Sequence, residues 1–261
     1  MTITDPLTEK RLTDEQLRQV AELLPGADSV ELKVTMPVSG VRAAVGSMGM
    51  DPLDAQIRQV FFFDTPSLAL NEHGVVVRAR RMRGRPHDTV IKLRPVVPSE
   101  LPDEVRSSPS LGVEIDAMPG GFVCSASMKR TLKKDKIAEV AAGDRPLRKL
   151  FSKEQRAFFD RYAPRGFELD ELSILGPVFV LKLKDAPIGF NRKVVGEMWL
   201  YPDGTQIVEL STKCAPDEAF EVAAQTREFL AAHGVDLGSE QQTKTKTALE
   251  YFANELTRPA T

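Results

Sequence analysis

Several short stretches of the chain alternate basic with apolar residues. They read Val77-Arg78-Ala79-Arg80, Ile91-Lys92-Leu93-Arg94, Leu181-Lys182-Leu183-Lys184 and, more briefly, Glu31-Leu32-Lys33. Successive side chains of a strand point to opposite faces, so each stretch predicts a strand with one apolar and one basic face. The pattern leaves two arrangements open. The basic rows form a solvated outer surface, or the sheet closes and they line a channel suited to a polyanion.

The hydrophobic pattern predicts strands and helices in mixed order. Strands are predicted over residues 29–36, 60–63, 75–82, 89–94, 113–116, 167–172, 178–184, 194–201 and 206–213. Helices are predicted over 13–24, 135–163, 216–233 and 246–256, with a shorter one over 51–59. Residues 37–50 and 95–112 are predicted to be loops, and 126–134 fits either type of element.

This order of elements predicts one α+β domain over residues 1–261. Its core is expected over about 29–256, preceded by an N-terminal helical extension over 1–28. The sheet is expected to be mostly antiparallel, and eight strands are about the number that closes into a narrow barrel.

Composition narrows the possible partners. The 261 residues include 35 Lys and Arg against 37 Asp and Glu, a formal net charge of −2, which argues against a nucleic-acid-binding protein. Cys124 and Cys214 lie far apart in sequence, which excludes a cysteine-rich zinc site or a disulfide scaffold and predicts two free thiols. No signal peptide or membrane-spanning run is visible, so we expect a cytoplasmic protein without a membrane partner.

Carboxylates accompany the basic rows at strand spacing. Glu31 shares a face with Lys33, as do Glu114 with Asp116, Glu168 with Asp170, and Glu209 with Ser211 and Lys213. Cations bind phosphate oxygens, and carboxylates hold Mg²⁺ or Mn²⁺ that bridges to the phosphates. The mixture favours a polyphosphate held together with a divalent metal.

Seven short motifs follow one another between about Val30 and Phe252. They are Val30-Glu31-Leu32-Lys33, Phe63-Asp64-Thr65-Pro66, Val77-Arg78-Ala79-Arg80 preceded by Gly74, Val90-Ile91-Lys92-Leu93, Leu169-Asp170-Glu171, Val208-Glu209-Leu210-Ser211-Thr212-Lys213 and Thr243-Lys244-Thr245-Lys246-Thr247. Their order resembles the CYTH superfamily of triphosphate tunnel metalloenzymes, which includes class IV adenylate cyclases, thiamine triphosphatases and inorganic triphosphatases. The resemblance implies an eight-stranded antiparallel closed β-barrel, surrounded by helices, that holds a triphosphate and divalent cations.

The resemblance also implies roles for individual residues. Catalytic roles are expected for Glu31 and Lys33. Substrate-binding roles are expected for Arg78, Arg80, Lys92, Arg94, Lys182, Lys184, Lys213 and Lys244. Mg²⁺ or Mn²⁺ is expected on Glu31, Glu114, Glu168, Asp170 and Glu209. The expected partner is a small molecule that contains a triphosphate, and the sequence leaves open whether the chain forms a homodimer.

Two positions depart from the motifs of the superfamily. Its opening Glu-x-Glu-x-Lys is here Ser29-x-Glu31-x-Lys33, and its late Glu-x-Glu is here Glu209-x-Ser211. A serine hydroxyl is a neutral ligand and does not replace the charge of a carboxylate, so we expect one metal rather than two. The expected function is metal-dependent hydrolysis of a triphosphate. A non-catalytic polyphosphate- or nucleotide-binding module and a class IV-type adenylate cyclase are the alternatives.

Overall fold

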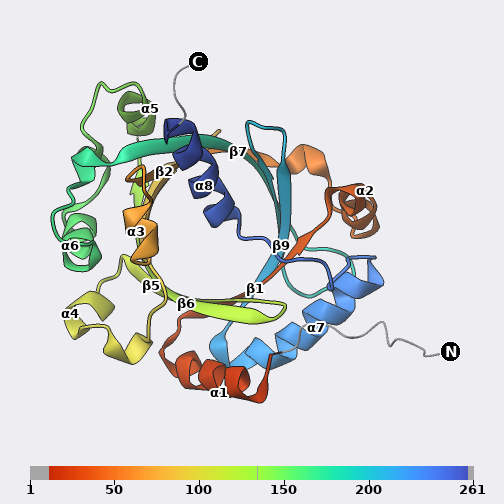
Figure 1. Ribbon diagram of the computed structural model, residues 1–261. Coiled ribbons are helices and arrows are strands. Elements are labelled where there is room, and N and C mark those ends of the chain that lie inside the picture. The colour runs from red at the N-terminus through yellow and green to blue at the C-terminus, as the bar shows by residue number, and fades with distance from the viewer. Residues whose placement is uncertain (1–11, 134, 258–261) are drawn as a thin grey trace.

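Nine strands close into a barrel in the computed structural model, which describes residues 12–133 and 135–257. The ring runs in the order β1-β5-β6-β4-β3-β2-β7-β8-β9, and Figure 1 shows it from one end. The strands are β1 (Ser29–Met36), β2 (Gln56–Asp64), β3 (Val75–Met82), β4 (His87–Leu93), β5 (Leu111–Met118), β6 (Gly121–Leu132), β7 (Ser173–Asp185), β8 (Val194–Leu200) and β9 (Gln206–Cys214).

The predicted α+β class and the predicted closed barrel are confirmed. The predicted number of eight strands and the predicted fully antiparallel pairing are wrong. β1 pairs with β5 in parallel, and the other neighbouring pairs are antiparallel. A ring of nine strands cannot alternate direction all the way round, so an odd strand number requires a parallel pair. The additional strand is β6, which covers the stretch that the sequence pattern left ambiguous.

Several predicted elements differ from the structure. The predicted helix over 135–163 is divided into α5 (Lys136–Ala141), η4 (Leu147–Leu150) and α6 (Lys153–Tyr162), and the predicted loop over 95–112 contains α4 (Asp103–Arg106). Residues 167–172 contain the 3₁₀ turn η5 (Leu169–Glu171) in place of a strand. The predicted loop over 37–50 contains α2 (Val38–Ser47), whose Val41, Ala44, Val45 and Met48 pack on the barrel. The predicted helix over 51–59 is only the 3₁₀ turn η2 (Pro52–Asp54), capped by Asp51, and β2 begins two residues later.

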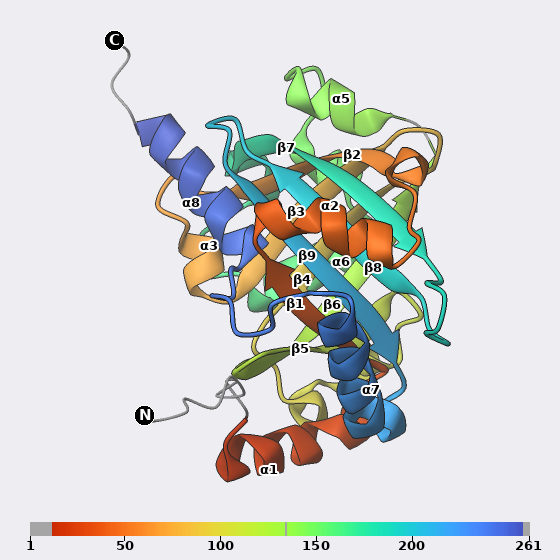
Figure 2. The same ribbon diagram turned by 90° about the vertical axis from the view of Figure 1, so that its right-hand side faces the viewer.

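Helices surround the barrel, and one of them, α8 (Lys244–Thr257), lies across one end of it (Figure 1). They are α1 (Asp14–Leu23), α2, α3 (Ala69–Glu72), α4 (Asp103–Arg106), α5 (Lys136–Ala141), α6 (Lys153–Tyr162), α7 (Ala219–Ala232) and α8 (Lys244–Thr257). Figure 2 shows α2 and α7 on the side of the barrel that carries β1 and β9. Among the described residues, no helix combines the length and the apolar character that crossing a membrane requires.

Two hydrophobic clusters lie between the barrel wall and the helices outside it, and a third, with Val60, Val76 and Trp199 on the lumen side and Ala248 of α8, lies at one end of the barrel. On β3, Val77 and Ala79 are buried in the same cluster as Phe158 and Phe159 of α6. The alternate residues of β3 point the other way, into the lumen. The basic rows of the strands therefore face the lumen, which answers the question that they left open.

The Phe63-Asp64-Thr65-Pro66 motif has a structural role at the end of β2. The Asp64 carboxylate accepts hydrogen bonds from the backbone N–H groups of Thr65 (2.7 Å), Leu70 (2.9 Å) and Asn71 (3.0 Å). Burial nevertheless raises the pKa of Asp64 above its ordinary value. Asp64 thus fixes the connection from β2 through α3 to β3.

Candidate functional site

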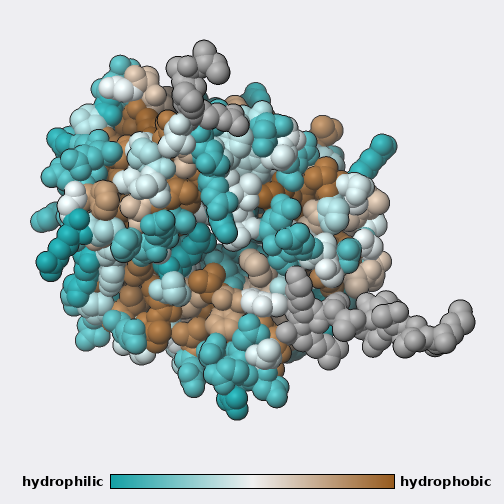
Figure 3. All heavy atoms as spheres, viewed as in Figure 1, coloured by the Kyte–Doolittle hydropathy of each residue, from teal (hydrophilic) through white to brown (hydrophobic). Residues whose placement is uncertain are grey.

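Charged side chains line a cavity of about 310 Å³ in the barrel lumen. Its ten basic residues are Lys33, Arg58, Arg78, Arg80, Lys92, Arg94, Lys129, Lys182, Lys213 and Lys244. Its five acidic residues are Glu31, Glu114, Asp116, Glu197 and Glu209. Hydrophilic side chains gather around the middle of the face shown in Figure 3, where the barrel opens. The lumen is therefore strongly positive although the chain as a whole carries a net charge of −2.

Three arginines form the most basic part of the lumen. Arg80 holds Asp88 with both ends of its guanidinium, at 2.8 Å from Nε to Oδ1 and 2.6 Å from Nη2 to Oδ2. Arg58 donates to the neutral Gln56 Oε1. Arg78 Nε is buried, and no described residue accepts a hydrogen bond from it. Burial, with the nearby charge of Arg80, lowers the pKa of Arg78 to about 10, so this cation stays charged at neutral pH.

A second part of the lumen holds three carboxylates. One oxygen from each of Glu31, Glu114 and Asp116 lies within 4.8 Å of the other two. The parallel pairing of β1 with β5 places Glu31 opposite Asp116 and Ser29 opposite Glu114. Carboxylate oxygens are hard ligands of the kind that Mg²⁺ and Mn²⁺ prefer, so this donor set fits such an ion.

Lysines neutralise these carboxylates. Lys33 Nζ lies 2.8 Å from Asp116 Oδ1 and 3.1 Å from Glu31 Oε2, and Lys92 Nζ lies 2.9 Å from Asp116 Oδ2. Lys213 forms an ion pair with Glu114. Three ammonium groups thus balance three carboxylates, and the excess positive charge of the lumen lies with the other cations.

The pKa values of the two lysines that form ion pairs with Asp116 are shifted in opposite directions. Burial by itself would lower the pKa of Lys33, but attraction by Asp116 and Glu31 is stronger and raises it above its ordinary value. Burial dominates at Lys92 and lowers its pKa despite its contact with Asp116. Burial opposes ionisation of Asp116, but Lys33 and Lys92 prevail and lower its pKa. Asp116 and Lys33 are therefore both charged at neutral pH.

The serines that replace glutamates in the motifs bind two of these same carboxylates. Ser29 Oγ donates to Glu114 Oε2 at 3.3 Å, and Ser211 Oγ donates to Glu31 Oε1 at 3.1 Å. Each serine therefore orients a carboxylate of the acidic cluster instead of adding one.

Glu197 and Glu209 form a separate acidic group beside the start of α8. Lys182 Nζ lies 2.8 Å from Glu197 Oε1, and Lys244 Nζ lies 2.7 Å from Glu209 Oε1 and also contacts Glu197. Burial would raise the pKa of Glu197, but Lys244 and Lys182 hold it well below its ordinary value. Lys244 also lies over the Trp199 ring, 5.4 Å from its centroid. These contacts bring the start of α8 into the lumen.

Gly74 places Arg94 at the edge of this cavity. Its φ is +75°, and a Cβ there would collide with the carbonyl oxygen of Arg94. The backbone N–H of Arg94 donates to the Gly74 carbonyl at 2.8 Å. The glycine thus permits the close approach that fixes Arg94 just beyond the end of β4.

Most of the residues predicted from the sequence meet in the lumen. They are Glu31, Lys33, Arg78, Arg80, Lys92, Arg94, Glu114, Lys182, Glu209, Lys213 and Lys244. Lys184 is exposed and lines a neighbouring cavity with Arg192 and Lys193.

Two predicted metal ligands lie elsewhere. Glu168 and Asp170 are exposed at η5, outside the strands of the barrel, and Asp170 is bound to Arg148. The alternation that suggested a strand here belongs to a turn, so neither carboxylate joins the acidic cluster.

Sequence reasoning missed Arg58, Lys129 and Glu197 as lumen residues. Arg58 fell in a predicted helix, and Lys129 fell in the ambiguous stretch that forms β6. Glu197 had a usable signal, because it alternates with Trp199 on a correctly predicted strand. Asp116 was recognised as sharing a face with Glu114 but was not named as a ligand.

Comparison with solved structures identifies the fold. HpAC1 from Hippeastrum, a proposed adenylyl cyclase with a dominant triphosphatase activity, superposes with a TM-score of 0.64 at 14% identity over 85% of this chain and 95% of that chain. A proposed adenylate cyclase from Bacillus halodurans superposes with a TM-score of 0.59 at 12% identity over 85% and 97%. The chain has their fold. These neighbours agree with the resemblance to the CYTH superfamily. No protein family model and no curated protein matches the sequence.

Proposed function

We propose that the chain hydrolyses a triphosphate in the barrel lumen with the help of a divalent metal ion. The observation that carries the proposal is the division of the lumen, in which Arg58, Arg78 and Arg80 share the cavity with the clustered carboxylates of Glu31, Glu114 and Asp116. The arginines suit phosphate oxygens, and the carboxylates suit a metal bound to the same polyphosphate. The triphosphatase activity of the Hippeastrum neighbour supports this proposal.

Each part of the lumen has a role in this proposal. Arg78 and Arg80 bind and orient the phosphate chain, because arginine forks match phosphate oxygens. Glu31, Glu114 and Asp116 would hold Mg²⁺ or Mn²⁺, which when bound supplies Lewis-acid polarisation of a phosphoryl oxygen. Lys33 stays protonated and acts as a cation beside the transferred phosphoryl group, since its raised pKa excludes it as a base. Cytoplasmic location and the choice of metal stay predictions from the sequence.

A non-catalytic phosphate-binding module is the second candidate, and the two serines favour it. With Ser29 and Ser211 in place of glutamates, the lumen has fewer carboxylates for metal than the motifs of the superfamily provide. Cyclisation of ATP is the third candidate function. It is supported by the two structural neighbours, which are both proposed cyclases.

A panel of substrates separates the three candidates. Tripolyphosphate, ATP and thiamine triphosphate are each incubated with the full chain in Mg²⁺, Mn²⁺ or EDTA, and phosphate and cyclic AMP are measured. We expect metal-dependent release of phosphate from at least one triphosphate. Cyclic AMP without phosphate release would favour the cyclase, and binding without any product would favour the binding module.

A further inference from the structure

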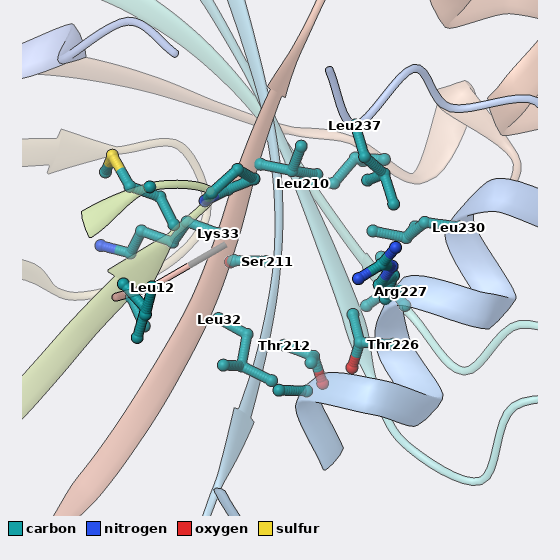
Figure 4. A pocket seen from close by; sticks show the side chains of 17 residues that line it. Leu12, Leu32, Lys33, Leu210, Ser211, Thr212, Thr226, Arg227, Leu230 and Leu237 are labelled. Carbon is teal, nitrogen blue, oxygen red and sulfur yellow. The ribbon is translucent and has the colours of Figure 1, made fainter. Parts of the chain in front are cut away.

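A second cavity lies outside the barrel, between α7 and the backs of β1 and β9. Its volume is about 230 Å³, and Figure 4 shows the side chains around it. The lining is mostly aliphatic and includes Leu12, Leu32, Val34, Leu210, Leu230 and Leu237. β1 and β9 separate it from the lumen, where Lys33 and Ser211 place their polar groups. The cavity is therefore distinct from the proposed phosphate site.

One polar group on the wall of this cavity is unsatisfied. Thr226 of α7 is only 8% exposed, and its Oγ1 has no hydrogen-bond partner within residues 12–133 and 135–257. Thr212, beside it in Figure 4, already donates its hydroxyl to the Lys193 carbonyl at 3.0 Å. A buried hydroxyl without a partner is uncommon in folded proteins. The hydroxyl is therefore left to bond a molecule that enters this otherwise apolar space.

We propose that this cavity binds a medium-chain carboxylic acid. A cavity of about 150 Å³ accepts benzene, so about 230 Å³ suits an aliphatic chain of roughly eight carbons. The carboxylate oxygen accepts a hydrogen bond from Thr226, and Arg227 lines the same wall and supplies positive charge near the head group. An apolar body with one fixed polar contact is the usual composition of a small-molecule site.

The proposal is tested by calorimetric titration of octanoate into the full chain, with adipate as the matched ligand. We expect saturable binding of one octanoate per chain and none of adipate, because its second carboxylate would be buried without a partner. The nearly isosteric Thr226→Val change should weaken octanoate binding by about 10-fold, the value of one lost hydrogen bond to a charged group. Ala223→Phe, which adds a ring from α7 into the cavity, should abolish binding.

Thermal unfolding of the free proteins shows whether each variant is folded. Absence of saturable octanoate binding to the unmodified chain overturns the proposal. Unchanged affinity in folded Thr226→Val also overturns it, because octanoate would then bind at another surface. None of these binding and unfolding measurements depends on the proposed hydrolysis of a triphosphate.

Discussion

Lys33 and Asp116 form an ion pair across the parallel strands β1 and β5, with 2.8 Å between Nζ and Oδ1. Lys33 also contacts Glu31, so one ammonium group lies between two of the three clustered carboxylates. The pairing keeps Lys33 protonated and Asp116 ionised at neutral pH. The lumen thus has fixed charges of both signs, arranged to receive a metal ion together with its anionic ligand.

Arg78→Met should weaken binding of tripolyphosphate. Arg78 Nε has no acceptor among the described residues, so its removal breaks no hydrogen bond at that atom, and Asp88 keeps its ion pair with Arg80. We expect a loss of about 1.5–3 kcal/mol in binding free energy, about 10- to 150-fold in Kd, measured by calorimetry. The free energy of unfolding without ligand should change little, since burial of the guanidinium opposes folding while its attraction to Asp88 and Glu197 favours folding.

Arg81→Met is the matched control on the same strand. Arg81 points away from the lumen and pairs with Asp135 at 2.5 Å. Its Kd for tripolyphosphate should match that of the unmodified chain. Equal Kd values for both variants would place the binding site elsewhere.

Glu31→Gln should abolish metal-dependent turnover and retain binding of tripolyphosphate. The amide keeps the size of the side chain and removes the charge that is proposed to hold the metal. We expect the rate of phosphate release to fall by about 100-fold or more, which exceeds the usual effect of changing an outer-shell partner of a metal ligand. Glu168→Gln, at an exposed position outside the barrel, should leave the rate unchanged. A Glu31→Gln protein of full activity would exclude Glu31 from the mechanism.

Binding of tripolyphosphate should weaken as the pH rises above neutrality. Burial lowers the pKa of Lys92 and of Lys129, so these cations lose their protons at lower pH than an ordinary lysine. The anion favours their charged forms, so the chain should take up protons on binding at alkaline pH below the ordinary lysine pKa of about 10.4. Calorimetry in two buffers of different ionisation enthalpy measures this uptake.

Lys92→Arg separates Lys92 from the other groups that titrate. Arginine stays charged throughout this pH range, so proton uptake should be smaller in the variant. If uptake is the same in both proteins, Lys92 does not contact the anion.

Ser29→Glu should make stability depend on metal. Ser29 faces Glu114 across β1 and β5, and its Oγ lies 3.3 Å from Glu114 Oε2. A glutamate there adds a like charge, which should lower the free energy of unfolding in EDTA by about 1 kcal/mol. Mn²⁺ should then raise the unfolding temperature more than it does in the unmodified chain. Ser29→Gln is the neutral control, and an equal Mn²⁺ response in both variants would argue against a metal site here.

Much of the lumen could be predicted because its strands have a local signal. β3 matches its predicted bounds of 75–82, and the alternation of Arg78 and Arg80 with Val77 and Ala79 shows which residues share a face. The sequence did not reveal whether that basic face points inward. Inward orientation depends on closure of the ring and on apolar partners such as Phe158, which are distant in sequence.

The remaining elements lacked such a signal. β6 presents the small residues Ser125 and Ser127 on its lumen side, so the stretch has little contrast between its two faces. Its Lys129 could not be assigned to a strand for this reason. At η5, Asp170 accepts a hydrogen bond from the backbone N–H of Arg148 at 2.7 Å, a contact that sequence alternation cannot reveal.

The most direct test of the account is a crystal structure of the chain soaked with tripolyphosphate and Mn²⁺, with the anomalous signal of manganese recorded. We expect a manganese peak beside Glu31, Glu114 and Asp116, and phosphate density in the lumen against Arg78 and Arg80. A lumen without phosphate at a ligand concentration that saturates binding in solution would contradict the account.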